Sequence, residues 1–305
     1  MRYSKTTTSV LVLVCGAICG WTSAALAGPP DDQIIISEVV DATLPGGLPK
    51  YVELTNCGSP TVELSLYSLG NFNNGSTKLG GDASTVLGGT LGDGESYVVA
   101  YEFAPSDVDC VVDADCGSNQ FCPDGACIST FENTYGFPPD QFIGPFVNGD
   151  DVIALFFGPA TGDGSDAILI DIYGEIGVDG TGEVWEYTDS YSFRLSGVTS
   201  PTPVFDPNEW FFAGANALEV GGDDDLKLPV IQKNTTPGVH ACTAGSCPAD
   251  FDEDGTVGAS DLAELLGNWG LYEPCPPFDD ADFDEDCDIN AADLAQLLGN
   301  WGPCP

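Results

Sequence analysis

The carboxyl-terminal part of the chain contains two copies of an acidic loop whose spacing suits a hard cation. The first copy runs from Asp250 to Asp261 and the second from Asp282 to Asp293, an offset of 282 − 250 = 32 residues. Carboxylates at alternate positions converge because the intervening residues point away, and calcium takes about six to eight oxygen ligands. A backbone carbonyl, a water-linked or amide oxygen and a closing carboxylate complete each cage. The loops predict two calcium ions, held by Asp250, Asp252, Asp254, Thr256 and Asp261 in the first copy and by Asp282, Asp284, Asp286, Asp288, Asn290 and Asp293 in the second.

An amphipathic helix is expected directly after each loop. Leucine and tryptophan recur at i, i+3, i+4 and i+7, at Leu262, Leu265, Leu266 and Trp269 and again at Leu294, Leu297, Leu298 and Trp301. One such helix cannot bury its apolar face alone, so the two copies are expected to pack together. We expect these side chains to form a core, with a partner-binding stripe as the alternative. Residues 242–305 hold 15 acidic and no basic residues, so without cations this segment repels itself.

No pattern of a known catalytic site is present in the sequence. The chain has no G-x-S-x-G, no Walker loop and no H-E-x-x-H, and its sole histidine, His240, is interpreted as a linker residue. Acidic residues are so numerous that a pair of hydrolytic carboxylates stays possible, but nothing singles one out. The other acidic clusters, at 150–151, 163–166 and 223–225, are expected to be solvated turns.

The charge balance excludes several classes of partner. The 305 residues include 48 acidic and 7 basic ones, which gives a formal charge of −41. Nucleic acids and anionic lipids carry phosphate charge and are repelled by such a surface. Hydrophobic residues make up 43%, so a folded core is expected rather than a disordered acidic tail.

The first 27 residues match a secretory signal peptide. Arg2 and Lys5 precede a short apolar run at 10–19, and Ala25-Leu26-Ala27 matches a cleavage site. The alternative is a transmembrane anchor, but the run is too short to span a bilayer. We expect a soluble, exported protein, secreted or at the cell surface of a bacterium, with no transmembrane segment after cleavage.

Ten cysteines remain after the signal peptide, which predicts five disulfides in an oxidising compartment. Four of them crowd into Cys110–Cys127, where we expect a two-disulfide knot. Zinc is the alternative, although the spacing lacks the C-x-x-C pairs that zinc sites prefer. The sequence leaves three connectivities open for this knot.

The body of the chain is expected to be mainly β. Short runs rich in β-branched and aromatic residues alternate with Gly, Pro and Asn turns, and no long amphipathic helix is expected before residue 258. In 51–54, the side chains are expected to alternate between inward and outward positions. Strands are expected at 33–40, 51–54, 62–64, 96–101, 151–157, 167–173, 184–187, 191–195 and 209–212, forming an antiparallel sandwich.

The serial order of these runs resembles the lamin-tail domain of exported bacterial proteins. The order is IIISEVV, YVELTN, VELSLYSLGNF, GTLGDGESYVVAY, DDVIALFF, ILIDIYG and SYSFRL, ending in NTTPG, from about 31 to 238. The resemblance implies an immunoglobulin-like β-sandwich that binds or adheres and has no active site, with the cysteine knot as an insertion at about 105–130.

The paired loop-helix units resemble a dockerin domain, with EF-hand-like calcium loops, over 247–305. The resemblance implies a cohesin-like partner. Two features depart from the dockerin pattern: Cys287 replaces the glycine at the tight turn, and Ala259-Ser260 with Ala291-Ala292 replace the polar pair that helps select a cohesin. Asp261 and Asp293 close the loops where ordinary EF-hands have Glu. The partner therefore stays open between a cohesin and a cell-surface component.

The sequence thus predicts a signal peptide at 1–27, a β-sandwich at 31–241 and a small all-α calcium-binding domain at 247–305. The expected function is that of an exported, non-enzymatic scaffold or adhesion protein. One alternative is an exported hydrolase with a carboxylate site in the sandwich, and another is a calcium-buffering surface protein without a specific partner.

Overall fold

Two β-sheets form the main body of the protein. The computed structural model describes residues 33–303 apart from 59, 145–146, 196, 222–223, 241, 243–248, 250, 252–255, 273–278, 280 and 285, so the expected signal peptide lies outside the described residues. The larger sheet has the strand order β10 (Gln141–Phe142), β7 (Ser96–Ala100), β2 (Leu48–Asn56), β1 (Ile34–Leu44), β13 (Ser190–Arg194) and β14 (Trp210–Phe212). The smaller sheet has the order β12 (Ile168–Tyr173), β11 (Val152–Phe157), β4 (Tyr67–Phe72) and β5 (Thr85–Val86). The expected mainly-β class is confirmed.

All pairs in these sheets are antiparallel except β7 with β10. The two sheets share one apolar core, to which β1 contributes Ile34, Ile36 and Val39, and β11 contributes Val152 and Leu155. Burial of such side chains is the main favourable term in folding, at about 25 cal/mol per Å² of apolar surface. Two short strands, β3 (Val62–Glu63) and β6 (Thr90–Leu91), pair beside them, and single 3-10 turns lie at Leu64–Leu66, Gly80–Asp82, Asp113–Asp115 and Pro207–Glu209.

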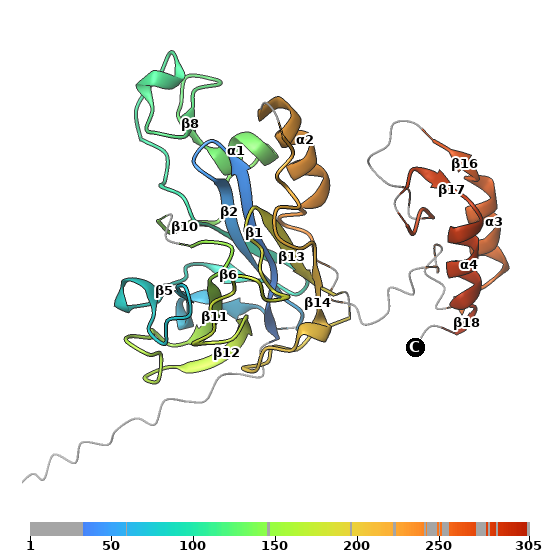
Figure 1. The fold of residues 1–305 in the computed structure, drawn as a ribbon, viewed down its shortest axis with the longest axis horizontal. Helices are drawn as coiled ribbons and strands as arrows, with labels where there is room; N and C mark the ends of the chain where they lie inside the picture. Colours follow the sequence, from blue (N-terminus) through green and yellow to red (C-terminus); the bar gives the residue numbers. More distant parts are fainter. Residues whose placement is uncertain are drawn as a thin grey trace, which may run out of the picture. The chain divides into compact units, whose positions relative to one another are not determined.

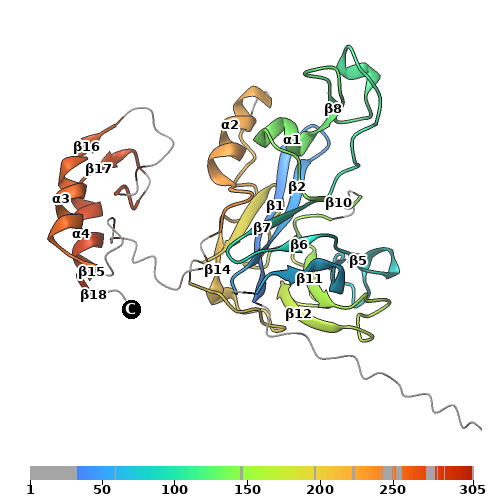
Figure 2. The ribbon, with the colours of Figure 1, turned by 180° about the vertical axis from the view of Figure 1, so that it is seen from behind.

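The six-stranded sheet is covered on its second face by two helices. Helices α1 (Thr130–Tyr135) and α2 (Asp224–Asn234) lie against β1 and β2 in both views (Figures 1 and 2). Phe131 and Ile231 are fully buried there and pack in one cluster with Tyr51 and Val98. Every residue of β1 is therefore buried, and the strand lacks an outer face. The sequence did not reveal α2, because Pro229 interrupts it and its apolar residues do not follow a helical period.

The strand expected at 184–187 is wrong. Trp185 and Tyr187 are buried in a turn region, where both rings meet Tyr173 edge-on at centroid distances of 6.2 and 5.4 Å. The Trp185 ring occupies the space that a Cβ at Gly174 would fill, and Gly174 has a φ of +86°. These aromatic residues belong to the core without belonging to a sheet, which local alternation cannot distinguish from a strand.

The cysteine-rich insertion is a two-disulfide knot, as expected. Its bonds join Cys110 to Cys122 and Cys116 to Cys127, and a short hairpin of β8 (Gln120–Phe121) and β9 (Ile128–Ser129) lies within it. A third bond joins Cys57, just after β2, to Cys242. This bond closes 185 residues into one loop, and long loops restrict the unfolded chain most.

The two carboxyl-terminal repeats interlock through short strands. The first comprises β15 (Thr256–Val257), α3 (Ala259–Gly267) and β16 (Gly270–Leu271), and the second comprises β17 (Asp288–Ile289), α4 (Ala291–Gly299) and β18 (Gly302–Pro303). Each loop strand pairs with the strand after the other copy's helix, β15 with β18 and β17 with β16. Their shared core is Ala249, Val257, Leu265, Ala281, Ile289 and Leu297.

The expectation of a core role is wrong for half of the repeated leucines and tryptophans. Leu265 and Leu297 are fully buried, whereas Leu266, Leu298, Trp269 and Trp301 are 46–51% exposed. The four exposed residues occupy equivalent positions in the two copies.

Among the helices of the described residues, none has the length and apolarity to span a bilayer.

Candidate functional site

Three of the predicted calcium ligands of the second loop come together. Oxygen atoms of Asp282, Asp284 and Asp293 all lie within 4.8 Å of one another. Asp282 and Asp293 are buried, and Asp284 is exposed. The donor set consists of carboxylate oxygens, which are the hard ligands that calcium prefers.

Asp293 fixes the closing end of this loop. It is the third residue of α4, where its carboxylate accepts hydrogen bonds from Asn290 N–H at 2.8 Å and from Phe283 N–H at 2.7 Å. A carboxylate in the first turn of a helix satisfies backbone N–H groups that have no helical partner. Asp293 thereby ties the end of the loop to its beginning and holds its own oxygens beside Asp282.

Asp282 organises the opening turn of the loop. Its carboxylate accepts bonds from Cys287 N–H at 2.9 Å and from the Tyr272 hydroxyl at 2.9 Å. Cys287 has a φ of +69°, the left-handed conformation that normally favours glycine, and it is disulfide-bonded. The loop thus keeps the tight turn that the sequence pattern requires, with a cross-linked residue in place of glycine.

The first loop repeats this closure. Asp261 is fully buried and accepts bonds from Gly258 N–H and Phe251 N–H, both at 2.7 Å. The spacings to these donors are the same as those around Asp293. Three predicted ligands of this loop, Asp250, Asp252 and Asp254, lie outside the described residues, and Thr256 begins β15.

The remaining predicted ligands of the second loop engage one another. Asp286 accepts the N–H of Asp288 at 2.9 Å, and the Asn290 side chain donates to the Asp288 carbonyl at 2.7 Å. The Asn290 side-chain oxygen also accepts Ala292 N–H at 2.9 Å, as the N-cap of α4. Their role as ligands stays a prediction.

The carboxylates of the second loop repel one another. The pKa of Asp284 is raised, first by desolvation and then by the charges of Asp286, Asp293 and Asp282. No lysine or arginine occurs in residues 242–305 to offset these charges. A bound cation would relieve this repulsion.

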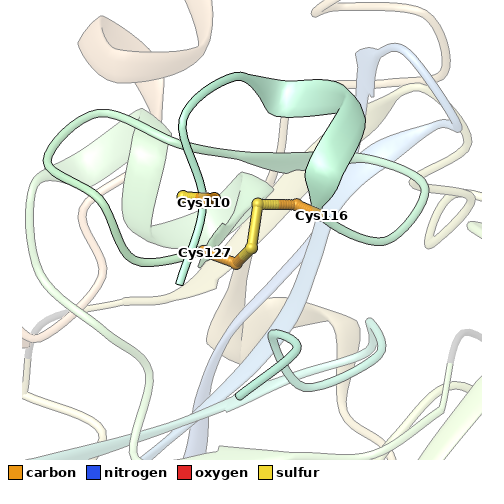
Figure 3. A group of neighbouring side chains, drawn as sticks. All are labelled: Cys110, Cys116 and Cys127. Carbon is orange, nitrogen blue, oxygen red and sulfur yellow. A yellow bond between two sulfur atoms is a disulfide. The ribbon is translucent and has the colours of Figure 1, made fainter. Parts of the chain in front are cut away.

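The zinc alternative for the cysteine insertion is wrong. Sulfur atoms of Cys110, Cys116 and Cys127 do lie within 4.8 Å of one another. All three belong to disulfides, so none is a thiolate that can bind zinc, and Figure 3 shows the bond between Cys116 and Cys127 with Cys110 beside it.

A second acidic group, which the sequence analysis missed, lies inside the main body. Glu38 of β1 and Glu53 of β2 are directly opposed in the strand register and both are buried, and the expected in-and-out alternation of 51–54 is absent because all four residues are buried. Glu38 accepts bonds from the Tyr51 hydroxyl at 2.5 Å and from Thr236 N–H at 3.1 Å. Glu53 accepts bonds from the Ser37 hydroxyl at 2.6 Å and from Gly238 N–H. The sequence signal that could have revealed this pair is Glu38, a charged residue within the β-branched run IIISEVV.

The pKa values of the two glutamates are raised. Burial, followed by the charge of Glu53, raises the pKa of Glu38 to about 8, and burial raises the pKa of Glu53 to about 6. Glu38 is therefore largely protonated at neutral pH, while Glu53 is largely ionised. The segment 236–240, which supplies the backbone donors, is held against the sheet by this pair.

His240 is not a bare linker residue. It lines a cavity of about 230 Å³ together with Ser37, Glu38, Glu53, Phe193, Arg194, Leu195, Thr236 and Val239. Burial, followed by the charge of Arg194, lowers the pKa of His240 to about 4, so its ring is neutral.

Two of the other acidic clusters can be compared with the expectation of solvated turns. The turn at 163–166 is exposed at both Asp163 and Asp166, as expected. Asp151 is fully buried instead, because its carboxylate accepts N–H bonds from Asn74 and Asn148 at 2.9 and 2.8 Å.

Comparison of the chain with protein-family models, with curated proteins and with solved structures finds no match.

Proposed function

We propose that this is an exported, non-enzymatic binding or scaffold protein that binds about two calcium ions through its paired carboxyl-terminal loops. The convergence of Asp282, Asp284 and Asp293 carries this proposal. The identical closure around Asp261 extends it to the first loop. The disulfides Cys57–Cys242, Cys110–Cys122 and Cys116–Cys127 support an oxidising compartment outside the cytosol.

Calorimetric titration of the mature chain with calcium tests the metal. We expect two binding events, of which Asp261→Asn removes one and Asp293→Asn the other. Asp163→Asn is the matched control, because this exposed carboxylate accepts hydrogen bonds within its own turn, from Ser165, and lies outside both loops. Absence of binding heat at millimolar calcium, or two events surviving in both loop variants, would contradict the proposal.

The scaffold role rests on the finer reading of both parts, an immunoglobulin-like lamin-tail sandwich and a dockerin-like repeat pair. The exposed Leu266, Trp269, Leu298 and Trp301 offer a duplicated apolar surface for a cohesin-like or cell-surface partner. Capture of a purified cohesin domain in calcium but not in chelator supports this role. Failure with both cohesin and isolated cell envelope favours the calcium-buffering alternative.

The hydrolase alternative now has a specific observation in its favour, the buried pair of Glu38 and Glu53 with separated pKa values. Each of these carboxylates is, however, engaged by hydroxyl and N–H donors of the chain itself. We therefore favour a structural role for the pair. Glycoside hydrolysis that is abolished by Glu53→Gln, with thermal unfolding unchanged, would reverse this preference.

A further inference from the structure

We propose that Lys50 and Asp41 are a covalent modification site, at which Lys50 Nζ forms an amide bond with Asp41 Cγ within the folded main body. This site involves none of the calcium loops and is independent of the function proposed above. The inference rests on the distance between the two groups, on their burial, and on the backbone groups that hold each of them.

The two side chains face each other across one hairpin. Asp41 of β1 and Lys50 of β2 are direct partners in the antiparallel register, which shifts between this pair and the hairpin end. Lys50 Nζ lies 2.9 Å from Asp41 Oδ1, and the two side chains are only 12% and 6% exposed. Well-oriented groups within one molecule react at effective concentrations of about 10⁵–10⁸ M. A pair that stays ionic in dilute solution can therefore condense when it is held in this way.

Backbone groups hold the reacting atoms on both sides. Lys50 Nζ donates a hydrogen bond to the Val147 carbonyl at 3.0 Å, which directs the amine at the carboxyl group. The Gly149 N–H donates to Asp41 Oδ2 at 3.0 Å. Negative charge develops on this oxygen when an amine attacks Cγ, and an N–H group already aimed at it stabilises that charge.

The turn that supplies these two backbone groups is itself fixed. The Asp151 carboxylate accepts N–H bonds from Asn148 at 2.8 Å and from Asn74 at 2.9 Å. A Cβ at Gly149 would overlap the backbone of Thr188, so the chain is packed tightly there. The carbonyl of Val147 and the N–H of Gly149 therefore keep their positions relative to the ion pair.

The condensation balances without a further reactant. An ammonium group and a carboxylate become one amide and one water, as the Nζ–Cγ bond forms and the Cγ–Oδ1 bond breaks. Two protons of Nζ leave with Oδ1 as water, and the third stays on the amide nitrogen. Burial raises the pKa of Asp41 against the lowering effect of Lys50, so the site favours the uncharged acid that this reaction requires.

The other ion pairs of the described residues lack one of these features. Lys227 Nζ lies 3.4 Å from the Glu219 carboxylate, and the Glu219 side chain is 43% exposed. Arg194 is buried with Asp171, but a guanidinium group keeps its proton in proteins and is not a nucleophile. Lys50 with Asp41 is thus the described pair that combines an amine, a short distance and burial of both partners.

Peptide mapping of the mature, folded protein provides a direct readout. Trypsin cleaves after a lysine whose amine is free, and residues 28–78 contain Lys50 and Lys78 as their basic residues. After unfolding and disulfide reduction, we expect the fragment 28–78, lighter than its sequence by the mass of one water. Fragmentation of this peptide should show residues 41 and 50 joined. Cleavage after Lys227 should proceed normally and is the internal control.

Lys50→Arg tests the chemistry, because it keeps a positive charge beside Asp41 but removes the amine. We expect cleavage at position 50, the full mass of both fragments and an unchanged calcium titration. Lys227→Arg is the matched control, since it makes the same substitution at the more exposed ion pair. This variant should retain the linked fragment 28–78.

Each alternative outcome has a distinct signature. Cleavage after Lys50 with full fragment masses would overturn the proposal. Loss of water with Lys50 still cleaved would show that an aspartate has closed on the backbone instead, and would also overturn it. A link from Lys50 to another carboxylate, such as that of Asp151, or loss of water that persists in Lys50→Arg, would exclude the proposed bond as well.

Discussion

The six-stranded sheet and the carboxyl-terminal repeats neutralise their carboxylates in different ways. In the sheet, Glu38 and Glu53 lie among backbone N–H and hydroxyl donors, and burial shifts Glu38 towards its protonated form. In the second loop, Asp282, Asp284 and Asp293 gather without any basic side chain in residues 242–305. Both regions surround their carboxylates with N–H and hydroxyl donors, so the difference lies in the burial of a pair in the sheet against the gathering of three carboxylates in the loop.

The largest effect should follow from removing the closing carboxylate of the second loop. Asp293→Ala leaves the N–H groups of Phe283 and Asn290 without their acceptor, at about 1–3 kcal/mol each, and removes one of the proposed calcium ligands. We expect loss of one calcium-binding event and of the calcium-dependent rise in melting temperature contributed by that event. Calorimetry and thermal unfolding in calcium measure both. Two intact binding events would place the metal elsewhere.

A second difference should appear on titration with acid. The pKa of Glu38 is raised from 4.5 to about 8, so its contribution to stability is present at low pH and is lost as pH rises through 8. Protonation of Glu38 should therefore stabilise the main body by about 2 kcal/mol between pH 8 and pH 6.5, at about 1.4 kcal/mol per pH unit, and Glu102, whose pKa burial raises to about 7, adds to this gain. Below pH 6.5 the further contribution of Glu38 is opposed by His240, whose pKa is lowered to about 4.

Glu38→Gln is the matched control for this pH dependence, since it keeps the shape of the protonated acid. Denaturant unfolding of this variant should vary much less between pH 8 and pH 6.5. Calcium affinity should change little over the same window, because aspartates ordinarily ionise well below it. If calcium affinity changed with pH as strongly as the stability of the main body, the proposed difference between the two regions would be wrong.

A smaller effect is expected from the cross-link at Cys287. Its left-handed backbone disfavours a side chain by about 1 kcal/mol, and the disulfide limits the alternatives open to the loop. Reduction should weaken calcium binding at the second loop about fivefold and leave the first loop nearly unchanged. Asp261→Asn and Asp293→Asn assign the two affinities. Equal weakening of both loops would show that Cys287 has no special role.

The smallest effect on folding should come from the duplicated surface residues. Trp269 and Trp301 are about half exposed, so the double substitution to alanine should leave both calcium affinities within about twofold. If the double variant no longer captures the partner but still binds calcium, the two tryptophans serve partner binding and not the folding of the repeats. Loss of calcium binding would instead show that these rings stabilise the repeats.

Local patterns in the sequence predicted the features that depend on local spacing. The repeat offset of 32 residues predicted both helices, and the β-branched runs predicted most strands. Cysteine spacing predicted the knot, while the choice among its three connectivities required the fold.

Features that depend on distant segments were not predictable in this way. The expected alternation of 51–54 is absent because α1, α2 and segment 236–240 cover the second face of the sheet. The local sequence around His240 is that of a linker, and only the fold shows that it lies beside residues of β1, β2 and β13. Leu266 and Leu298 read as core because a helical period shows which residues share a face, but not how much of that face the partner helix covers.

The crossed strand pairs of the repeats impose an order on biosynthesis. Among the described residues, the strand of the first loop, β15, pairs with β18, some 45 residues later in the chain (302 − 257 = 45 between Val257 and Gly302). While the chain is being made or exported, the first loop cannot complete its pairing until residues 302–303 have emerged. The repeat pair is thus expected to mature in one late step. A chain truncated after α4 would lose the brace of its first loop while every residue of that loop remains in place.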